Sequence, residues 1–292
     1  MINNAIANIV SISFTILYIS GFYLFEKSRA NGVKLSRQHP IVIKSRMKAV
    51  VFSCIITFII LSSLLYFYLP SFKFNTLFTL IGCFLPLSNP QKLCQLLKPL
   101  LLTNILFLGP LSLLYFDHDL PGQRNFDWNR DLFQLLTSLH GIRNYIFAPL
   151  TEEFVFRACI IAVLYQAKSS YTYLIFLSPC FFGLAHIHHG YEIYHQYGKT
   201  KQALKRAIFS CTFQFAYTTI FGWYVSFIFL RTSSLWPPVL CHSFCNMMGF
   251  PDTSTIHEHS QKQLIWTCYI LGPILFAFLL YPLSYVDDSF YW

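Results

Sequence analysis

Apolar runs of about the 20 residues that cross a bilayer recur along the chain. The longest lie at residues 5–25, 49–69, 204–230 and 263–285. Shorter apolar segments lie at residues 74–89, 99–116, 148–166, 171–187 and 235–250. This pattern predicts an all-α protein, a polytopic integral membrane helical bundle with about eight transmembrane helices.

The number of crossings before residue 148 is open in two places. Residues 74–89 are short and end near Pro86 and Pro90, so they form either a tilted span or a re-entrant piece. Residues 117–130 are polar and form a loop. Residues 131–147 mix leucines with His140, Arg143 and Asn144, which favours an interfacial amphipathic helix over a span with inward polar residues.

Composition and charge agree with a membrane protein. Of the 292 residues, 55% are hydrophobic and 11% are charged, and the mean hydropathy is +0.49. Soluble domains carry about 25% charged residues. The formal net charge of +9 comes from basic residues that gather in short loops between apolar runs, which indicates membrane topology and no nucleic-acid partner.

Two loops carry most of this positive charge. The first contains Lys27, Arg29, Lys34, Arg37, Lys44, Arg46 and Lys48. The second, at 188–206, contains Lys199, Lys201, Lys205 and Arg206. Both are predicted to be cytosolic, because basic loops stay on that side. We divide the chain into N-terminal helices and basic loop (1–147), a helical core (148–250), and a last helix with a short tail (251–292).

The cysteines give no sign of a metal site. Most of the nine lie inside apolar segments and lack the paired spacing of zinc-binding motifs. Cys241 and Cys245 share a helix face, but no second pair accompanies them. No metal and no cofactor are predicted.

Three apolar segments of the core carry polar side chains that are costly in a membrane. The segment 148–166 has Glu152, Glu153 and Arg157, and the segment 171–187 ends near His186. The segment 235–250 has His242 and Asn246. Ionisable groups at such positions usually mark function. If the loop at 188–206 is cytosolic, alternating helix directions place all of them in the cytosolic half of the bilayer.

The two glutamates are expected to differ in role. Glu153 and Arg157 are four residues apart and can form an ion pair on one helix face. Glu152 points about 100° away, which leaves its carboxylate free to act as a general base. His186 is expected to face Glu152 from the antiparallel helix, so that the two hold and deprotonate a water molecule.

His242 and Asn246 are also four residues apart. They would present an imidazole and an amide side by side, two donors suited to a developing oxyanion. His188 and His189 could support the site or could be loop residues at the interface.

Two other readings of these residues remain open. Glu152, His186 and His242 could bind zinc with an open water position, although the sequence has no His-Glu-x-x-His helix. Alternatively, the buried charges could be structural contacts in a scaffold or transporter.

The three motifs resemble those of the intramembrane CAAX protease and bacteriocin-processing family. That family has Glu-Glu-x-x-x-Arg, Phe-x-x-x-His and His-x-x-x-Asn. This chain has Glu152-Glu153-Phe-Val-Phe-Arg157, Phe182-Gly-Leu-Ala-His186 and His242-Ser-Phe-Cys-Asn246, complete and in the same order. The residues that surround the first two motifs, and the segment from Leu35 to Lys44, look like the eukaryotic type II CAAX prenyl endopeptidases, the Ras-converting enzymes.

This resemblance implies an endopeptidase that removes the last three residues of prenylated Cys-a-a-X proteins, such as Ras-like GTPases. It implies a multi-pass protein of the endoplasmic reticulum membrane with its site open to the cytosol and to lipid. Glu152 and His186 would activate the water, His242 and Asn246 would stabilise the oxyanion, and Glu153 and Arg157 would support them. Candidates for lining a lipid-facing opening are Phe154, Phe156, Phe181 and Phe182.

Overall fold

A computed structural model describes residues 2–28, 36–69, 72–86, 88–287 and 289–292. Within these ranges the chain is helical and contains no strand, which confirms the all-α prediction. Arg29, Lys34 and Leu35 of the first basic segment lie outside the described residues.

Twenty helical elements follow one another along the described chain. The first six are α1 (Asn4–Leu24), η1 (Glu26–Ser28), α2 (Pro40–Tyr68), α3 (Phe74–Ile81), α4 (Pro90–Leu106) and α5 (Leu108–Phe116). The next seven are η2 (Trp128–Gln134), α6 (Leu135–Thr137), α7 (Leu139–Gly141), η3 (Ile142–Phe147), α8 (Ala148–Glu153), η4 (Phe154–Cys159) and α9 (Ile160–Gln166). The last seven are η5 (Tyr173–Leu177), α10 (Pro179–Ala185), α11 (His188–Gln196), α12 (Lys201–Thr232), α13 (Trp236–Met248), η6 (Ile256–Glu258) and α14 (Lys262–Leu283).

The chain is a multi-pass membrane protein. Among the described residues, the four helices α1, α2, α12 and α14 are long and apolar enough to cross a bilayer. The pair α4 and α5, bent by 68°, would make a fifth span if it crosses as one unit. The number of about eight transmembrane helices therefore stays a prediction. The division of the chain into three parts, after residues 147 and 250, also stays a prediction.

The structure corrects the prediction made from the sequence for the region before residue 148. Residues 131–147 do not form one amphipathic helix but the broken path η2, α6, α7 and η3. Ser138 has an extended backbone there (ψ 151°), and its hydroxyl accepts a hydrogen bond from the Gly141 N–H. This local cap ends one helical piece and starts the next, which periodicity alone does not reveal.

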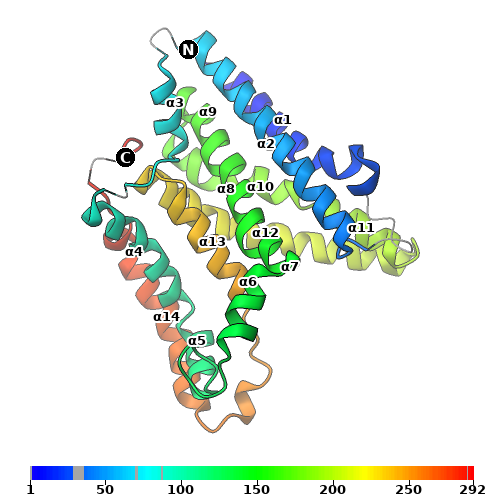
Figure 1. Cartoon of the computed structure of the whole chain (residues 1–292), viewed down its shortest axis with the longest axis vertical. Helices are drawn as coiled ribbons and strands as arrows, with labels where there is room; N and C mark the ends of the chain where they lie inside the picture. The colour runs from blue at the N-terminus through cyan, green and yellow to red at the C-terminus, as the bar shows by residue number, and fades with distance from the viewer. Residues whose placement is uncertain (1, 29–35, 70–71, 87, 288) are drawn as a thin grey trace.

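The helical run α8, η4 and α9 lies at the centre of the bundle (Figure 1). Every residue from Val155 to Leu164 is buried. Helices α1, α2, α12 and α13 pack against this run. Its middle part, η4, is π-helical and begins directly after Glu153. Such π segments are frequent at functional sites because they reorient the side chains of a helix.

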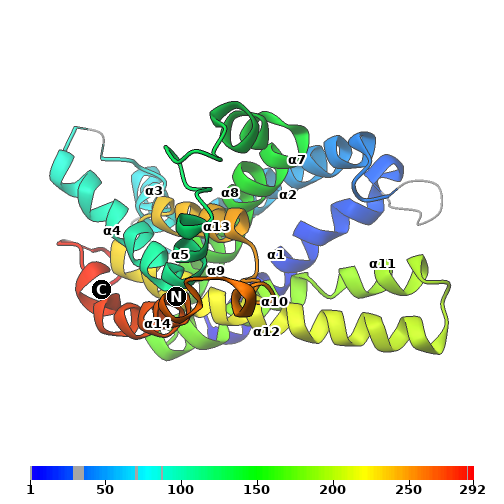
Figure 2. The same ribbon diagram turned by 90° about the horizontal axis from the view of Figure 1, so that it is seen from below.

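A hairpin extends sideways from this core. Figure 2 shows α11 and the N-terminal part of α12 lying side by side, on the side of the molecule away from α4 and α14. The segment 188–206, predicted to be a loop, belongs to this hairpin and is mostly helical: α11 begins two residues after His186, and Lys201, Lys205 and Arg206 lie at the start of α12.

Glycines bring α12 close to the elements that carry the site residues. A Cβ atom on Gly222 would lie 2.5 Å from the Cβ of Pro179 in α10 and 3.2 Å from Arg157 Nη2. A Cβ atom on Gly183 would lie 2.8 Å from side-chain atoms of Phe215 and Thr219. Close backbone approach at small residues is how membrane helices gain packing energy.

Replacing Gly222 with alanine should therefore destabilise the protein, by about 1–3 kcal/mol if the cost is that of an overpacked core. Thermal unfolding of the purified protein in detergent measures this effect. The control is Phe209→Ala on the same helix, because that side chain is 76% exposed. Equal unfolding temperatures for Gly222→Ala and the unchanged protein would contradict the tight contact.

Candidate active site

The two adjacent glutamates differ in exposure. Glu153, the last residue of α8, has a side chain with 0% exposure, whereas the Glu152 side chain is 19% exposed. Glu152 lines a large cavity and Glu153 lies behind its wall. The expected difference between the two carboxylates is present in the structure.

Arg157 is held in the core beside Glu153. Its Nε lies 3.1 Å from Glu153 Oε2, which confirms the predicted ion pair. The guanidinium also lies over the ring of Phe182, with its carbon 4.4 Å from the ring centroid. The Arg157 side chain is 1% exposed, so its charge depends on these two contacts for compensation.

His242 of α13 joins the two glutamates, a contact that the sequence did not predict. Its Nδ1 lies 2.7 Å from Glu153 Oε1, and its Nε2 lies 3.7 Å from Glu152 Oε2. A carboxylate only accepts hydrogen bonds, so Nδ1–H donates to Glu153. Glu153 therefore fixes the orientation of this imidazole as well as pairing with Arg157.

The predicted facing of His186 and Glu152 across a water molecule stays a prediction. His186 follows α10, and its Nδ1 lies 2.9 Å from the carbonyl oxygen of Phe182, to which it donates. No ion-pair contact joins it to Glu152 within the part of the chain that the structure describes; the histidine at that distance from Glu152 is His242. The physical reason is the register of the short helix α10, which turns the imidazole back onto its own preceding turn. His186 and Glu152 nonetheless line the same cavity.

Asn246 lies one turn beyond His242 in α13, as its spacing predicted. Its Nδ2 donates to the carbonyl oxygen of Asn144 in η3, at 2.9 Å. Asn246 is exposed and lines the cavity with His242. The contact with η3 shows that the irregular segment before residue 148 helps to position the site.

The four residues predicted to be catalytic line one cavity of about 1920 Å³: Glu152, His186, His242 and Asn246. Glu153 and Arg157, the two residues predicted to support them, are buried beside it. Part of the lining comes from aromatic residues of α12 that the sequence reasoning missed: Phe213, Tyr217, Phe221, Trp223, Tyr224 and Phe227. The ring of Phe221 lies 5.0 Å from that of His242.

The phenylalanines next to the motifs are packed in the core, although Phe182 also lines the cavity. Phe156 and Phe182 are 3% and 2% exposed, and Phe154 and Phe181 pack against the same core. Regular aromatic spacing in residues 213–227 was the signal in the sequence that could have identified the lining instead.

The described residues contain no group of three His, Cys, Asp or Glu side chains arranged to hold a metal ion. Cys241 is buried, and its Sγ lies 3.8 Å from the hydroxyl of Tyr224.

Carboxylates, imidazoles and an amide around one cavity in an apolar helical bundle are the groups of an intramembrane hydrolase. Residues 134–248 match the family described as type II CAAX prenyl endopeptidase Rce1-like. The chain belongs to this family, and it is a protease.

Curated relatives support the same assignment over most of the chain. CAAX prenyl protease 2 of Homo sapiens is 39% identical over 277 residues, which cover 94% of this chain and 79% of the human protein. The probable CAAX prenyl protease 2 of Schizosaccharomyces pombe is 34% identical, with 92% and 90% of the two chains covered. CAAX prenyl protease 2 of Saccharomyces cerevisiae is 32% identical, with 84% and 81% covered. No solved structure gave a significant match.

Proposed function

We propose that this protease removes the C-terminal tripeptide from prenylated Cys-a-a-X proteins, such as Ras-like GTPases, with a water molecule activated at Glu152. The observation that carries the proposal is the single cavity that joins Glu152, His186, His242 and Asn246 from three separate segments. The names of the relatives give the substrate class. Membership of a protease family disagrees with the scaffold or transporter alternative.

In this mechanism Glu152 takes a proton from water, and the resulting hydroxide attacks the carbonyl carbon after the prenylated cysteine. His186 shares in holding the water. Its Nδ1–H is engaged by the Phe182 carbonyl, so in the neutral ring Nε2 is left as an acceptor. The proton held by Glu152 then passes to the leaving amine of the tripeptide.

His242 and Asn246 would stabilise the tetrahedral oxyanion. His242 donates Nδ1–H to Glu153, and its Nε2 lies on the side of Glu152, so Nε2 is the ring nitrogen placed to face the oxyanion. A donor already oriented in a dry site costs little reorganisation during the reaction. Glu153 acts through His242, and Arg157 neutralises Glu153 in the core.

The cavity also suits a lipidated substrate. Its aromatic lining from α12 offers apolar surface for an isoprenoid, and the carboxylate and imidazole groups line the same cavity. The location we propose is the endoplasmic reticulum membrane, with the cavity reached from the cytosol. A glycosylation acceptor inserted between Gly198 and Thr200 should stay unmodified, because this loop is predicted to be cytosolic.

A direct test of the function uses purified protein with farnesylated and unprenylated Cys-a-a-X peptides. Release of the tripeptide from the farnesylated peptide, detected by mass spectrometry, is the expected result. Cleavage at any other bond, or equal cleavage of the unprenylated peptide, would contradict the proposed specificity.

Chelation tests the zinc alternative. We expect cleavage to continue at an unchanged rate in the presence of a strong chelator, since the proposed mechanism relies on Glu152 as the base. Rate measurements after chelation, combined with metal analysis of the active protein, check this. Loss of activity that stoichiometric zinc restores would replace the proposed mechanism with a metalloprotease.

A further inference from the structure

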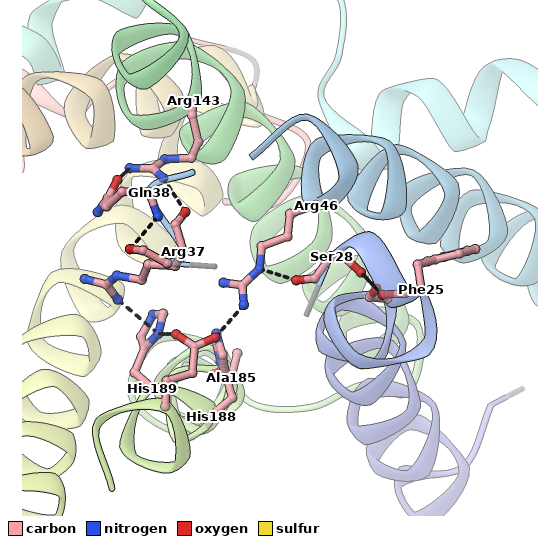
Figure 3. Close-up of polar contacts among 12 residues, drawn as sticks. Phe25, Ser28, Arg37, Gln38, Arg46, Arg143, Ala185, His188 and His189 are labelled. Atoms are coloured by element: carbon pink, nitrogen blue, oxygen red, sulfur yellow. Dashed lines mark hydrogen bonds and ion pairs between the residues drawn. The ribbon is translucent and has the colours of Figure 1, made fainter. Parts of the chain in front are cut away.

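Three arginine side chains lie near one another (Figure 3) and share a cavity with Glu152 and His186. Arg37 comes from the segment before α2, Arg46 from α2 and Arg143 from η3. All three line a second cavity of about 270 Å³. None of them belongs to the three motifs that contain the candidate catalytic residues, although Arg37 lies in the segment from Leu35 to Lys44 that also resembles the family.

One of these arginines is already neutralised. Arg46 Nη2 donates to Glu192 of α11, and its Nε donates to the carbonyl oxygen of Ser28. Burial raises the pKa of Glu192, but the hydrogen bond from His189 and the contacts with Arg46 outweigh it and hold the pKa at about 2. Glu192 is therefore ionised and compensates Arg46.

The other two arginines have no carboxylate partner among the described residues. Arg143 donates only to uncharged oxygens: Asn144 Oδ1 at 2.8 Å, Gln38 Oε1 at 2.9 Å and the carbonyl of Arg37 at 3.4 Å. Arg37 Nη1 lies 3.4 Å from Nδ1 of His189. Burial lowers the pKa of Arg143, and the charges of Arg37 and Arg46 lower it further. Uncompensated positive charge of this kind favours a bound anion.

The smaller cavity places the positive charge of Arg37 and Arg143 next to the candidate active site. Glu152 and His186 line both cavities, and so does Arg37. Arg37 therefore borders both cavities, whereas Arg143 borders only the smaller one. A substrate whose prenyl group occupies the large cavity would extend its C-terminal residues past Glu152 into the smaller one.

We propose that Arg37 and Arg143 bind the free α-carboxylate at the C-terminus of the substrate. This inference rests on the proposed function. Three extended residues span about 10 Å, and a guanidinium presents paired donors that match a carboxylate. Holding the chain end at a fixed place would set which bond reaches Glu152, and so would make the enzyme release a tripeptide.

The test compares two farnesylated Cys-a-a-X peptides, one with a free C-terminal carboxylate and one with a C-terminal amide. For the unchanged protein we expect KM for the amide to be about 10-fold or more above that for the acid, the size of one lost charge-assisted hydrogen bond. In the double variant Arg37→Gln/Arg143→Gln this ratio should fall toward one, chiefly through a higher KM for the acid. The variant Arg37→Gln/Arg143→Lys should have a higher ratio than the double glutamine variant, because the lysine keeps the positive charge at position 143.

The matched control is Arg124→Gln, an exposed arginine in the loop after α5, which should keep the full ratio. A ratio near one in the unchanged protein, or a ratio that the double variant leaves intact, would overturn the carboxylate site while leaving the protease function standing. Cleavage of neither peptide by the unchanged protein would instead reject the proposed function.

Anionic lipid is the competing occupant. Assays in vesicles of phosphatidylcholine, with and without phosphatidylserine, separate the two. If the double variant changes only the response to phosphatidylserine and leaves the acid-to-amide ratio intact, the arginines bind lipid and the proposal is wrong.

Discussion

Replacing Glu152 with glutamine should reduce cleavage of a farnesylated Cys-a-a-X peptide by about 10²–10⁴-fold, the usual contribution of a general base. Glutamine keeps the shape of the side chain but cannot take a proton from water. The protein should remain folded, because the ion-pair contact of Glu152 is a 3.7 Å approach to His242 at the cavity wall. Single-turnover rates, together with the thermal unfolding temperature, measure both effects.

The matched control for this change is Glu258→Gln, since the Glu258 side chain is 80% exposed in η6. It should leave both the rate and the unfolding temperature unchanged. A general base contributes at least about 10²-fold to the rate. If Glu152→Gln keeps more than about one tenth of the cleavage rate, Glu152 is not the general base.

Replacing Glu153 with leucine should cost both stability and activity. The sequence alone predicted only one contact for Glu153, the ion pair with Arg157. In the structure Glu153 holds both Arg157 and His242 in the core. Removing one partner of a buried ion pair typically costs about 3–5 kcal/mol. The loss of the Nδ1–H acceptor also leaves His242 without its orientation.

A double variant separates these two roles of Glu153. Glu153→Leu/Arg157→Met removes both buried charges, so its unfolding temperature should recover relative to Glu153→Leu alone. Its cleavage rate should stay low, because His242 still lacks a partner. Recovery of cleavage together with stability would show that Glu153 acts only by pairing with Arg157.

Much of the fold class could be read from hydrophobic patterning. The runs at 5–25 and 263–285 correspond to α1 and α14 within about two residues, because long apolar stretches have few alternatives to a membrane helix. Patterning was weaker where helices are short. Residues 74–89 contain the eight-residue α3, which ends at Gly82 with a left-handed backbone (φ 62°). Residues 99–116 contain a sharp bend between α4 and α5.

Candidate site residues were found by their chemistry, and their contacts depended on the fold. The spacing of Glu153 and Arg157 within one helix was enough to predict their ion pair, since neighbours four residues apart meet on a helix surface. The contact of Glu153 with His242 joins residues 89 positions apart. The facing of Glu152 and His186 across a water molecule stays a prediction, because the two residues line one cavity without a direct ion-pair contact among the described residues.

The sequence by itself determined a helical membrane protein with costly polar groups in three apolar segments. It could do so because composition and hydrophobic periodicity indicate which segments face lipid and which side chains are buried. Only the tertiary structure decided which of those groups touch, because α8 and α13 meet through packing between elements distant in the chain. The same packing brings Arg37 and Arg143 together beside Glu152, and no local pattern in either segment records that proximity.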